Sequence, residues 1–436
     1  MLTLFRSPRH CLVMCVSLFG FLTAAPAYAQ LMIQVTEGRL DAVPIAVVPF
    51  DDFGTVAPES VDNIIAANLY RSGQFRPLPP EDMLSRPSRA ENISYRDFRV
   101  LGAEYLLIGQ VEPLADSRYR VSYELHDVSR GTQLISETYE PAAAQLRDVA
   151  HTISDRVYEQ LTGVRGAFST RVLYVTHNRG AAYPYQLQYA DADGARVQTV
   201  LRSREPIMSP SWSPDGRKVA YVSFERDGLP GIYIHELASM QRQLVSSFPG
   251  INGAPHWSPD GSKLALTLSR DGNPELYLLD IASRELTRLT RHFAIDTEPR
   301  WLPDGKSLVF TSSRGGGPQI YRLELADGSV RRVSFEGSYN SNPTVTPDGR
   351  YLAYVHRRGD QFHIAVQDLQ RNTFNVVTST QQDESPSVAP NGSMIIYATK
   401  QGGKGVLQAV SIDGRIKVSL PSKEGEVREP SWSPFL

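Results

Sequence analysis

Carboxylates at a regular spacing are the most chemically suggestive feature of this 436-residue sequence. Asp215, Asp260, Asp304 and Asp348 recur at intervals of 45, 44 and 44 residues, each followed by glycine. Carboxylates that converge on one axis could bind a cation or attract a basic partner. An Asp-Gly pair is also what a tight turn requires, because the carboxylate bonds the local backbone and glycine takes a positive φ. We therefore interpret these four aspartates as turn residues.

A second set of polar residues lies ahead of each Asp-Gly phrase, where a loop leads into the next strand. This position predicts a ring around one mouth of a central channel, made by Glu205, Ala254, Glu298, Asn342, Ser385 and Glu429, with Asp296, Asp383 and Glu384 close by. Acids around a narrow opening focus negative potential, so the ring predicts a mouth that docks a basic protein loop or holds a cation. The alternative is that these acids are ordinary solvated loop ends.

Signatures of catalysis are missing from the sequence. It contains no Gly-x-Ser-x-Gly elbow, no His-Glu-x-x-His and no phosphate loop, and Gly402-Gly403-Lys404-Gly405 has the wrong spacing for one. The histidines are scattered, and His363 fits a packed position in an alternating strand. The competing interpretation is a metal-dependent propeller hydrolase or lactonase that uses the channel acids, but no base accompanies them. We predict a non-enzymatic protein without a catalytic residue, a cofactor or a bound metal.

A repeated phrase positions these acids. Pro210-Ser211-Trp212-Ser213-Pro214-Asp215-Gly216 returns around Trp257 and Trp301, in weaker form around Val345 and Val388, and in part around Trp432. A period near 44 residues with short strands between copies predicts a β-propeller with one four-stranded sheet per blade. The tryptophans are expected to pack between blades. Residues 171–201 offer only three strands, so the last copy is expected to complete that blade and close a six-bladed ring.

The chain divides into three parts by composition. Residues 1–29 combine Arg6 and Arg9, an apolar run and Ala27-Tyr28-Ala29, which is typical of a cleaved secretory signal peptide. Residues 30–165 alternate strand and helix patterns and predict an α/β domain, with a helix after Pro58-Glu59 and another from Leu146. Residues 168–436 read as strands only and form the propeller.

Composition narrows the possible environments and partners. The formal net charge is −2, and both cysteines, Cys11 and Cys15, lie in the expected signal peptide. The exported part is therefore expected to have no disulfide. Without a basic face, nucleic acid is not an expected partner. No segment after residue 29 approaches the roughly 20 apolar residues that a membrane span needs.

The order of these parts resembles the TolB family, the periplasmic propeller proteins of the Tol-Pal system in Gram-negative bacteria. The resemblance covers almost all of the exported chain, and the stretches that carry it are Ile45–Phe50, Asn252–Pro255, Thr297–Pro299, Asp383–Gly392 and the C-terminal Glu429–Leu436. Trp-Ser-Pro-Asp-Gly alone is shared by many propellers, but the combined order is specific.

The resemblance implies a monomeric adaptor with two partners. The outer-membrane lipoprotein Pal would bind the propeller mouth at Ile251, Ala254 and Thr297, together with the acids Glu205, Glu298 and Glu429. Ile251 stands where the family often has a histidine, so an apolar contact is expected there. The inner-membrane protein TolA would bind the N-terminal segment, about residues 30–38. Bacteriocins exploit the same surface in this family, and the complex supports outer-membrane invagination during division and outer-membrane integrity.

The N-terminal segment also has a strand pattern of its own. Leu31, Ile33 and Val35 alternate with polar residues and could add a strand to a sheet edge, in this chain or in a partner.

Overall fold

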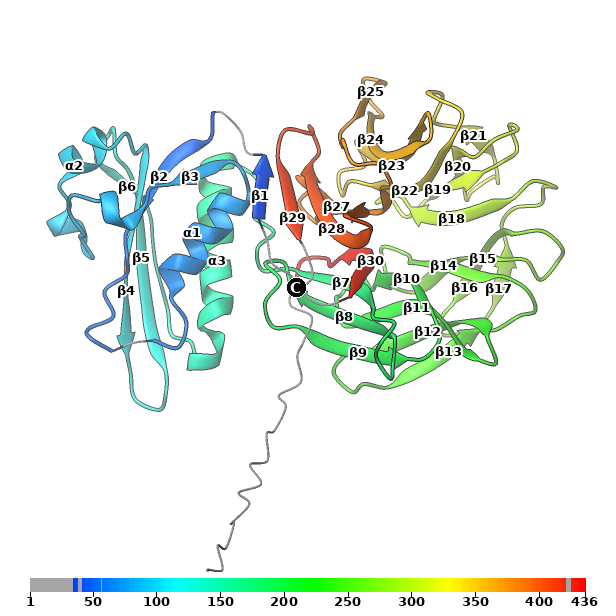
Figure 1. Cartoon of the computed structure of the whole chain (residues 1–436), viewed down its shortest axis with the longest axis horizontal. Helices are drawn as coiled ribbons and strands as arrows, with labels where there is room; N and C mark the ends of the chain where they lie inside the picture. Colours follow the sequence, from blue (N-terminus) through cyan, green and yellow to red (C-terminus); the bar gives the residue numbers. More distant parts are fainter. Residues whose placement is uncertain (1–33, 38–40, 56, 421–424) are drawn as a thin grey trace, which may run out of the picture.

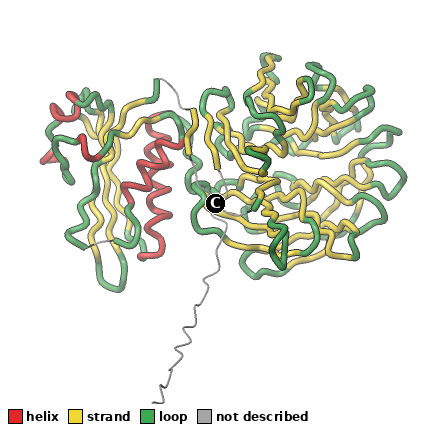
Figure 2. The backbone as a smooth tube through the Cα atoms, viewed as in Figure 1, coloured by secondary structure: helices red, strands yellow, loops and turns green. Residues whose placement is uncertain are grey.

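The structure, a computed structural model, describes residues 34–37, 41–55, 57–420 and 425–436. The N-terminal part is a mixed α/β domain, and the rest is a six-bladed propeller beside it (Figure 1). Helices occur in the N-terminal part, whereas the propeller consists of strands and loops (Figure 2). The predicted fold class is confirmed. The expected signal peptide lies outside the described residues.

One five-stranded sheet organises the N-terminal domain. Its order is β3-β2-β4-β5-β6. β2 (Val43–Val47) runs parallel to β3 (Phe75–Pro77) and β4 (Tyr105–Pro113). β4, β5 (Tyr119–Asp127) and β6 (Thr132–Tyr139) form an antiparallel meander.

Alternating apolar residues give this sheet two covered faces. Ile45 and Val47 point to the face that α1 (Val61–Arg71) and α3 (Leu146–Thr162) cover. Ala46 and Val48 point to the opposite face, which packs against Phe98 of α2 (Tyr95–Val100) and neighbouring loops that include the 3₁₀ turns η1 (Pro80–Asp82) and η2 (Ala90–Asn92). A third 3₁₀ turn, η3 (Ala143–Gln145), leads into α3.

The helix ends lie close to the positions that the sequence indicates. α1 begins one residue after Ser60, two residues later than Pro58-Glu59 suggested. Its end is marked by Gly73 at φ +65°. α3 ends at Gly163, whose left-handed conformation and bond to the Glu159 carbonyl are those of a glycine C-cap.

The propeller consists of six four-stranded antiparallel blades, numbered here from 1 to 6 along the chain. Blade 1 contains β30 (Glu426–Trp432), β7 (Arg171–His177), β8 (Tyr185–Asp191) and β9 (Gln198–Ser203). Blade 2 contains β10 (Ile207–Trp212), β11 (Lys218–Arg226), β12 (Leu229–Glu236) and β13 (Arg242–Ser246). Blade 3 contains β14 (Asn252–Trp257), β15 (Lys263–Leu268), β16 (Glu275–Asp280) and β17 (Leu286–Arg288).

The remaining blades follow the same order from the channel outward. Blade 4 contains β18 (Asp296–Trp301), β19 (Ser307–Ser312), β20 (Gln319–Glu324) and β21 (Val330–Arg332). Blade 5 contains β22 (Asn340–Val345), β23 (Tyr351–Arg358), β24 (Gln361–Asp368) and β25 (Thr373–Val376). Blade 6 contains β26 (Glu384–Val388), β27 (Met394–Gln401), β28 (Lys404–Ser411) and β29 (Lys417–Leu420).

The C-terminal strand closes the ring, as predicted. β30 is the innermost strand of blade 1 and pairs with β7, with Trp432 opposite Val172. Ser433 adds two bonds, because its backbone nitrogen donates to the Arg171 carbonyl and its side-chain hydroxyl accepts from the Arg171 nitrogen. The first blade is thus built from both ends of the propeller sequence, which leaves no open sheet edge at the seam.

The repeated phrase has the structural roles expected of it. Asp215 accepts bonds from the Ser213 hydroxyl and the Arg217 nitrogen, and Gly216 has φ +67°. The indole nitrogen of Trp257 donates to the Ser211 carbonyl of the preceding blade at 3.2 Å. The aspartates therefore shape turns, and the tryptophans connect neighbouring blades.

Candidate functional site

The channel mouth contains a ring of six residues in the left-handed conformation. Ordinary residues rarely adopt it, yet φ lies between +47° and +56° at Ser209, Ala254, Glu298, Asn342, Ser385 and Glu429. Each is followed by a proline, and each innermost strand shifts register there by a β-bulge. Because proline has no N–H, it cannot continue the ladder, and the bulge turns the preceding residue toward the channel.

Side chains from neighbouring blades satisfy the backbone groups that the bulges release. The Glu298 carboxylate accepts from the Asn342 nitrogen at 2.7 Å and from the Thr311 hydroxyl at 2.7 Å. The Glu429 carboxylate accepts from the Ser209 nitrogen at 3.2 Å. These two acids therefore hold adjacent blades together as well as lining the channel.

Glu205 is not a member of this ring. It lies in an exposed bend ahead of β10, and Ser209 occupies the equivalent position in blade 2. The repeat explains the difference, because the proline of the repeated phrase is Pro210, whereas Glu205 precedes Pro206. The expectation that Glu205 stands in the ring is wrong.

Asp296 and Asp383 do not face the opening either. Both are buried. Asp296 accepts from Ser312 and from the Arg314 guanidinium, while Asp383 accepts from Thr378 and Thr399. They fix the loops that carry the mouth and add no negative surface to it.

The electrostatics of the channel depend on a few charges in a confined space. Burial, together with the neighbouring charge of Glu384, raises the pKa of Glu429 to about 7. Burial likewise raises the pKa of Glu384. Arg300, from β18, offsets these carboxylates, although burial lowers its own pKa. The mouth is therefore less negative near neutral pH than the count of acids suggests.

Exposed apolar side chains flank the mouth, and the sequence reasoning missed most of them. They lie in or beside the loops that lead into blades 2 to 5 and comprise Met208, Ile251, Phe293, Ile295 and Phe335, with 43%, 46%, 89%, 50% and 66% exposed. We call these five residues the apolar crescent. Ile251 and Ile295 are 44 residues apart and directly precede the buried Asn252 and Asp296, so the repeat period could have revealed them.

The residues expected to contact a partner occupy different depths of this surface. Ile251 belongs to the apolar crescent. Ala254 is buried at the channel wall, with 8% exposed, and Thr297 is half-buried beside Thr267. Ala254, Glu298 and Glu429 line an open space of about 1390 Å³ in the channel.

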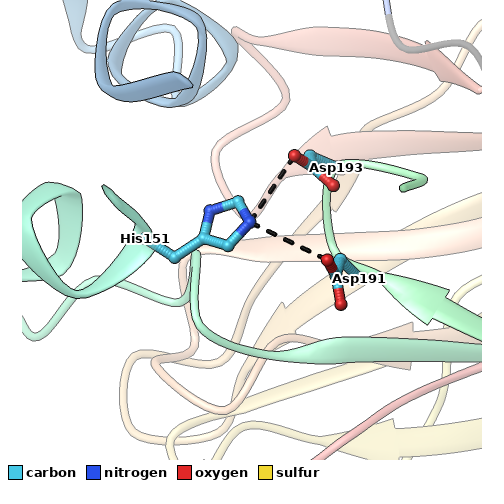
Figure 3. A group of neighbouring side chains, drawn as sticks. All are labelled: His151, Asp191 and Asp193. Carbon is cyan, nitrogen blue, oxygen red and sulfur yellow. Dashed lines mark ion pairs between the residues drawn. The ribbon is translucent and has the colours of Figure 1, made fainter. Parts of the chain in front are cut away.

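One cluster in the described part of the chain has the composition of a metal site, and it lies between the domains. His151 of α3 points toward Asp191 and Asp193 of blade 1 (Figure 3). The His151 Nε2 atom lies 3.5 Å from Asp193 and 4.0 Å from Asp191.

The hydrogen bonds around His151 argue against a metal. Asn68 presents its amide oxygen to Arg71 and its nitrogen to Ser154 and to His151 Nδ1. Nδ1 is therefore the acceptor, and the neutral ring carries its hydrogen on Nε2, which then has no lone pair for a cation. The Arg147 guanidinium also donates a hydrogen bond of 2.5 Å to the Asp193 carboxylate. These residues form a charge network between the two domains.

The N-terminal segment forms an additional strand on the propeller. β1 (Gln34–Glu37) pairs antiparallel with β29, with Val35 opposite Val418, and blade 6 thereby becomes five-stranded (Figure 1). Val35 thus lies on an edge of this chain's own sheet. Leu31 and Ile33 lie outside the described residues.

The fold and this mouth define a two-domain propeller protein whose exposed features suit contact with other proteins. Within the described residues no helix is long and apolar enough to cross a bilayer. The family models identify the group: residues 31–134 match the TolB amino-terminal domain, and residues 158–436 match the TolB beta propeller domain.

Individual relatives agree over nearly the full length. The Tol-Pal system protein TolB of Alcanivorax borkumensis is 73% identical over 97% of both chains, and that of Nitrosococcus oceani is 57% identical over 96% of this chain and 97% of its own. The crystal structure of TolB from Acinetobacter baumannii superposes with a TM-score of 0.87 at 42% identity, covering 93% of this chain and all of that one. The chain belongs to the TolB family, whose members are periplasmic, non-enzymatic components of the Tol-Pal system.

Proposed function

We propose that this protein is a periplasmic adaptor that links the outer-membrane lipoprotein Pal to the inner-membrane protein TolA. In this role it supports outer-membrane invagination during division and outer-membrane integrity. The family assignment implies partners within the Tol-Pal system. Residues 1–29 would direct export as a signal peptide, and their cleavage would leave a domain of residues 30–165 and a propeller of residues 168–436.

Pal is proposed to bind at the mouth. The observation that carries this proposal is the apolar crescent, because exposed apolar residues grouped on one face mark interaction sites. Ile251 and Phe293 would supply apolar contacts. Ala254 and Thr297 shape the channel wall behind them, while Glu298 and Glu429 provide a negative centre for a basic group of the partner. Glu205, exposed outside the ring, would contribute only at the rim.

The binding assay for Pal has a matched control on the opposite end of the propeller. Ile251→Asp should weaken binding of purified Pal by at least roughly tenfold, because a charge in an apolar contact must be desolvated. Met240→Asp replaces an equally exposed apolar residue in the β12–β13 turn, away from the mouth, and should leave affinity unchanged. Equal affinities for the two variants would contradict the proposed site.

TolA is proposed to bind the N-terminal segment, including Leu31, Ile33 and Val35, by taking it as a strand. Blade 6 supports a link between the two sites, because one hydrogen-bonded sheet runs from β26 at the channel to β1 at its outer edge. We propose that Pal docking changes whether this segment is free. Equal TolA affinity for the free protein and for its Pal complex would rule out this switch. Bacteriocins would compete with Pal for the same mouth.

A further inference from the structure

The interface between the two domains contains several buried charges. Arg147 and His151 come from α3, Arg71 comes from the last turn of α1, and Asp191 and Asp193 come from the end of β8 and the turn after it. His151, Asp191 and the Asp193 carboxylate are almost completely buried. The network therefore joins both helices of the N-terminal domain to blade 1.

Specific contacts hold this network together. Arg147 lies 2.5 Å from Asp193, 3.6 Å from Asp191 and 3.2 Å from the half-exposed Glu59. Arg71 reaches Asp193 at 3.8 Å. A second bridge runs alongside, because Arg196 of blade 1 contacts Asp191 at 2.7 Å and Asp148 of α3 at 2.5 Å. Every ion pair except Arg196–Asp191 and Arg147–Glu59 crosses between the domains.

One of these two helices, α1, lies beside the N-terminal strand. β1 has β29 on one side and contacts α1 of the N-terminal domain (Figure 1). The turn that follows α1 also rests on blade 6, since a side chain at Gly73 would meet Ile416 at 2.5 Å. Arg71 is thus paired with Asp193 two residues before Gly73, where the chain touches the blade that holds β1.

We propose that the Arg147–Asp193 network is a latch that keeps the N-terminal domain closed over β1. When the latch opens, α1 moves away from blade 6 and the edge of β1 becomes accessible without unfolding of either domain. The latch depends on the proposed function in one respect only. An accessible β1 is the form that a strand-binding partner would capture.

Physical chemistry favours a latch over simple stabilisation. Buried ion pairs recover little net free energy, because desolvation of the charges offsets their attraction, but they demand one geometry. If either partner is removed, an unpaired charge remains buried, and the interface relieves this by opening to water. A network of this kind therefore holds one relative orientation of two domains and releases it when a single charge is lost.

Hydrogen exchange measured by mass spectrometry on the chain from Gln30 onward tests the latch without any partner. Arg147→Met and Asp193→Asn should each speed exchange of the amides of residues 34–37 roughly tenfold, because each leaves a buried charge without its nearest partner. The double variant should exchange no faster than either single variant, because it leaves neither charge of this pair without its partner. The matched control is Arg120→Met, which breaks a surface ion pair with Glu112 and Glu140 inside the N-terminal domain. It should leave β1 exchange unchanged.

The proposal would be overturned if β1 exchange were unchanged in both single variants while the β4 and β19 amides stayed protected. It would also be overturned if Arg120→Met sped β1 exchange as much as the two latch variants did. If a variant loosens the β4 or β19 core, a distance measurement between the domains replaces exchange as the readout. Spin labels at Leu84→Cys and Met240→Cys suit this, because the chain after residue 29 has no cysteine. The expected result is a longer or broader distance distribution in Asp193→Asn. A distribution identical to that of the parent would refute the latch, whereas failure to bind Pal or TolA would affect only the proposed function.

Discussion

The carboxylate of Glu298 in blade 4 accepts a 2.7 Å hydrogen bond from the backbone nitrogen of Asn342 in blade 5. Both residues have positive φ, and both stand at β-bulges beside the channel. The acid that a partner would meet at the mouth is therefore also part of the contact between blades. A useful test must remove its charge and retain its ability to accept a hydrogen bond.

Glutamine meets this requirement, because its amide oxygen still accepts. The double variant Glu298→Gln/Glu429→Gln should keep the fold and weaken binding of Pal by roughly five- to tenfold at low ionic strength. The difference should shrink as salt is added, since salt screens charge attraction. Calorimetric titration at two salt concentrations measures both effects. Unchanged affinity at low salt would show that the mouth acids serve the fold alone.

Glu429 should also make stability depend on pH. Its ordinary pKa of 4.5 is raised to about 7 in the folded protein, so the folded state binds a proton more tightly than the unfolded state. The stability associated with this proton is fully present below pH 4.5 and is lost as pH rises through 7. Glu429→Gln should therefore raise the melting temperature at pH 8, by roughly 2–4 °C if about 1 kcal/mol is recovered, and have little effect at pH 4.5. A pH-independent change would indicate that lost packing, not charge, dominates.

The C-terminal strand should be indispensable for the closed ring. Removal of residues 431–436 takes away Trp432, which donates to Thr170 and pairs opposite Val172, and exposes the inner edge of β7 at Val172 and Leu173. We expect soluble yield to collapse and aggregation to increase, because an unpaired edge recruits other chains. Removal of the half-exposed Leu436 alone is the milder control. A truncated chain with an unchanged melting temperature would disprove closure by this strand.

How far the sequence predicts the structure depends on whether a feature repeats. The blades, their closure by β30 and the Asp-Gly turns follow from a period near 44 residues, and helices such as α3 follow from apolar spacing and glycine ends. The ring was misplaced at one position because two prolines, Pro206 and Pro210, precede Trp212. The buried roles of Asp296 and Asp383 depend on partners such as Arg314 and Thr399, whose proximity only the folded chain creates.

The interdomain network is the part that sequence reasoning did not find. His151 lies in a helix, and Asp191 and Asp193 lie 40 and 42 residues later in another domain, with no repeat relating them. Neither local propensity nor periodicity contains information on how two domains dock, so this contact had to come from the structure.

His151 should make the closed arrangement sensitive to acid. Burial lowers its pKa from 6.5 to about 4, with Asp193 opposing this effect and Arg147, Arg71 and Arg196 adding to it. Asn68 and Ser154, which also face the ring, are uncharged, and Asp191 is the second nearby acid. Because the folded pKa is depressed, the stability associated with a neutral His151 is present above pH 6.5 and is lost as pH falls toward 4. Protonation would place a fourth cation beside three guanidinium groups.

The corresponding experiment compares the parent chain with His151→Gln, whose amide oxygen can still accept from Asn68 but cannot titrate. In the parent, exchange of residues 34–37, corrected for the intrinsic effect of pH, should speed up between pH 7 and pH 5. The rise should be much smaller in His151→Gln. Asp191, whose pKa is raised by burial, contributes equally to both chains and so cancels in the comparison. Identical pH profiles for the two chains would show that His151 does not control the closure.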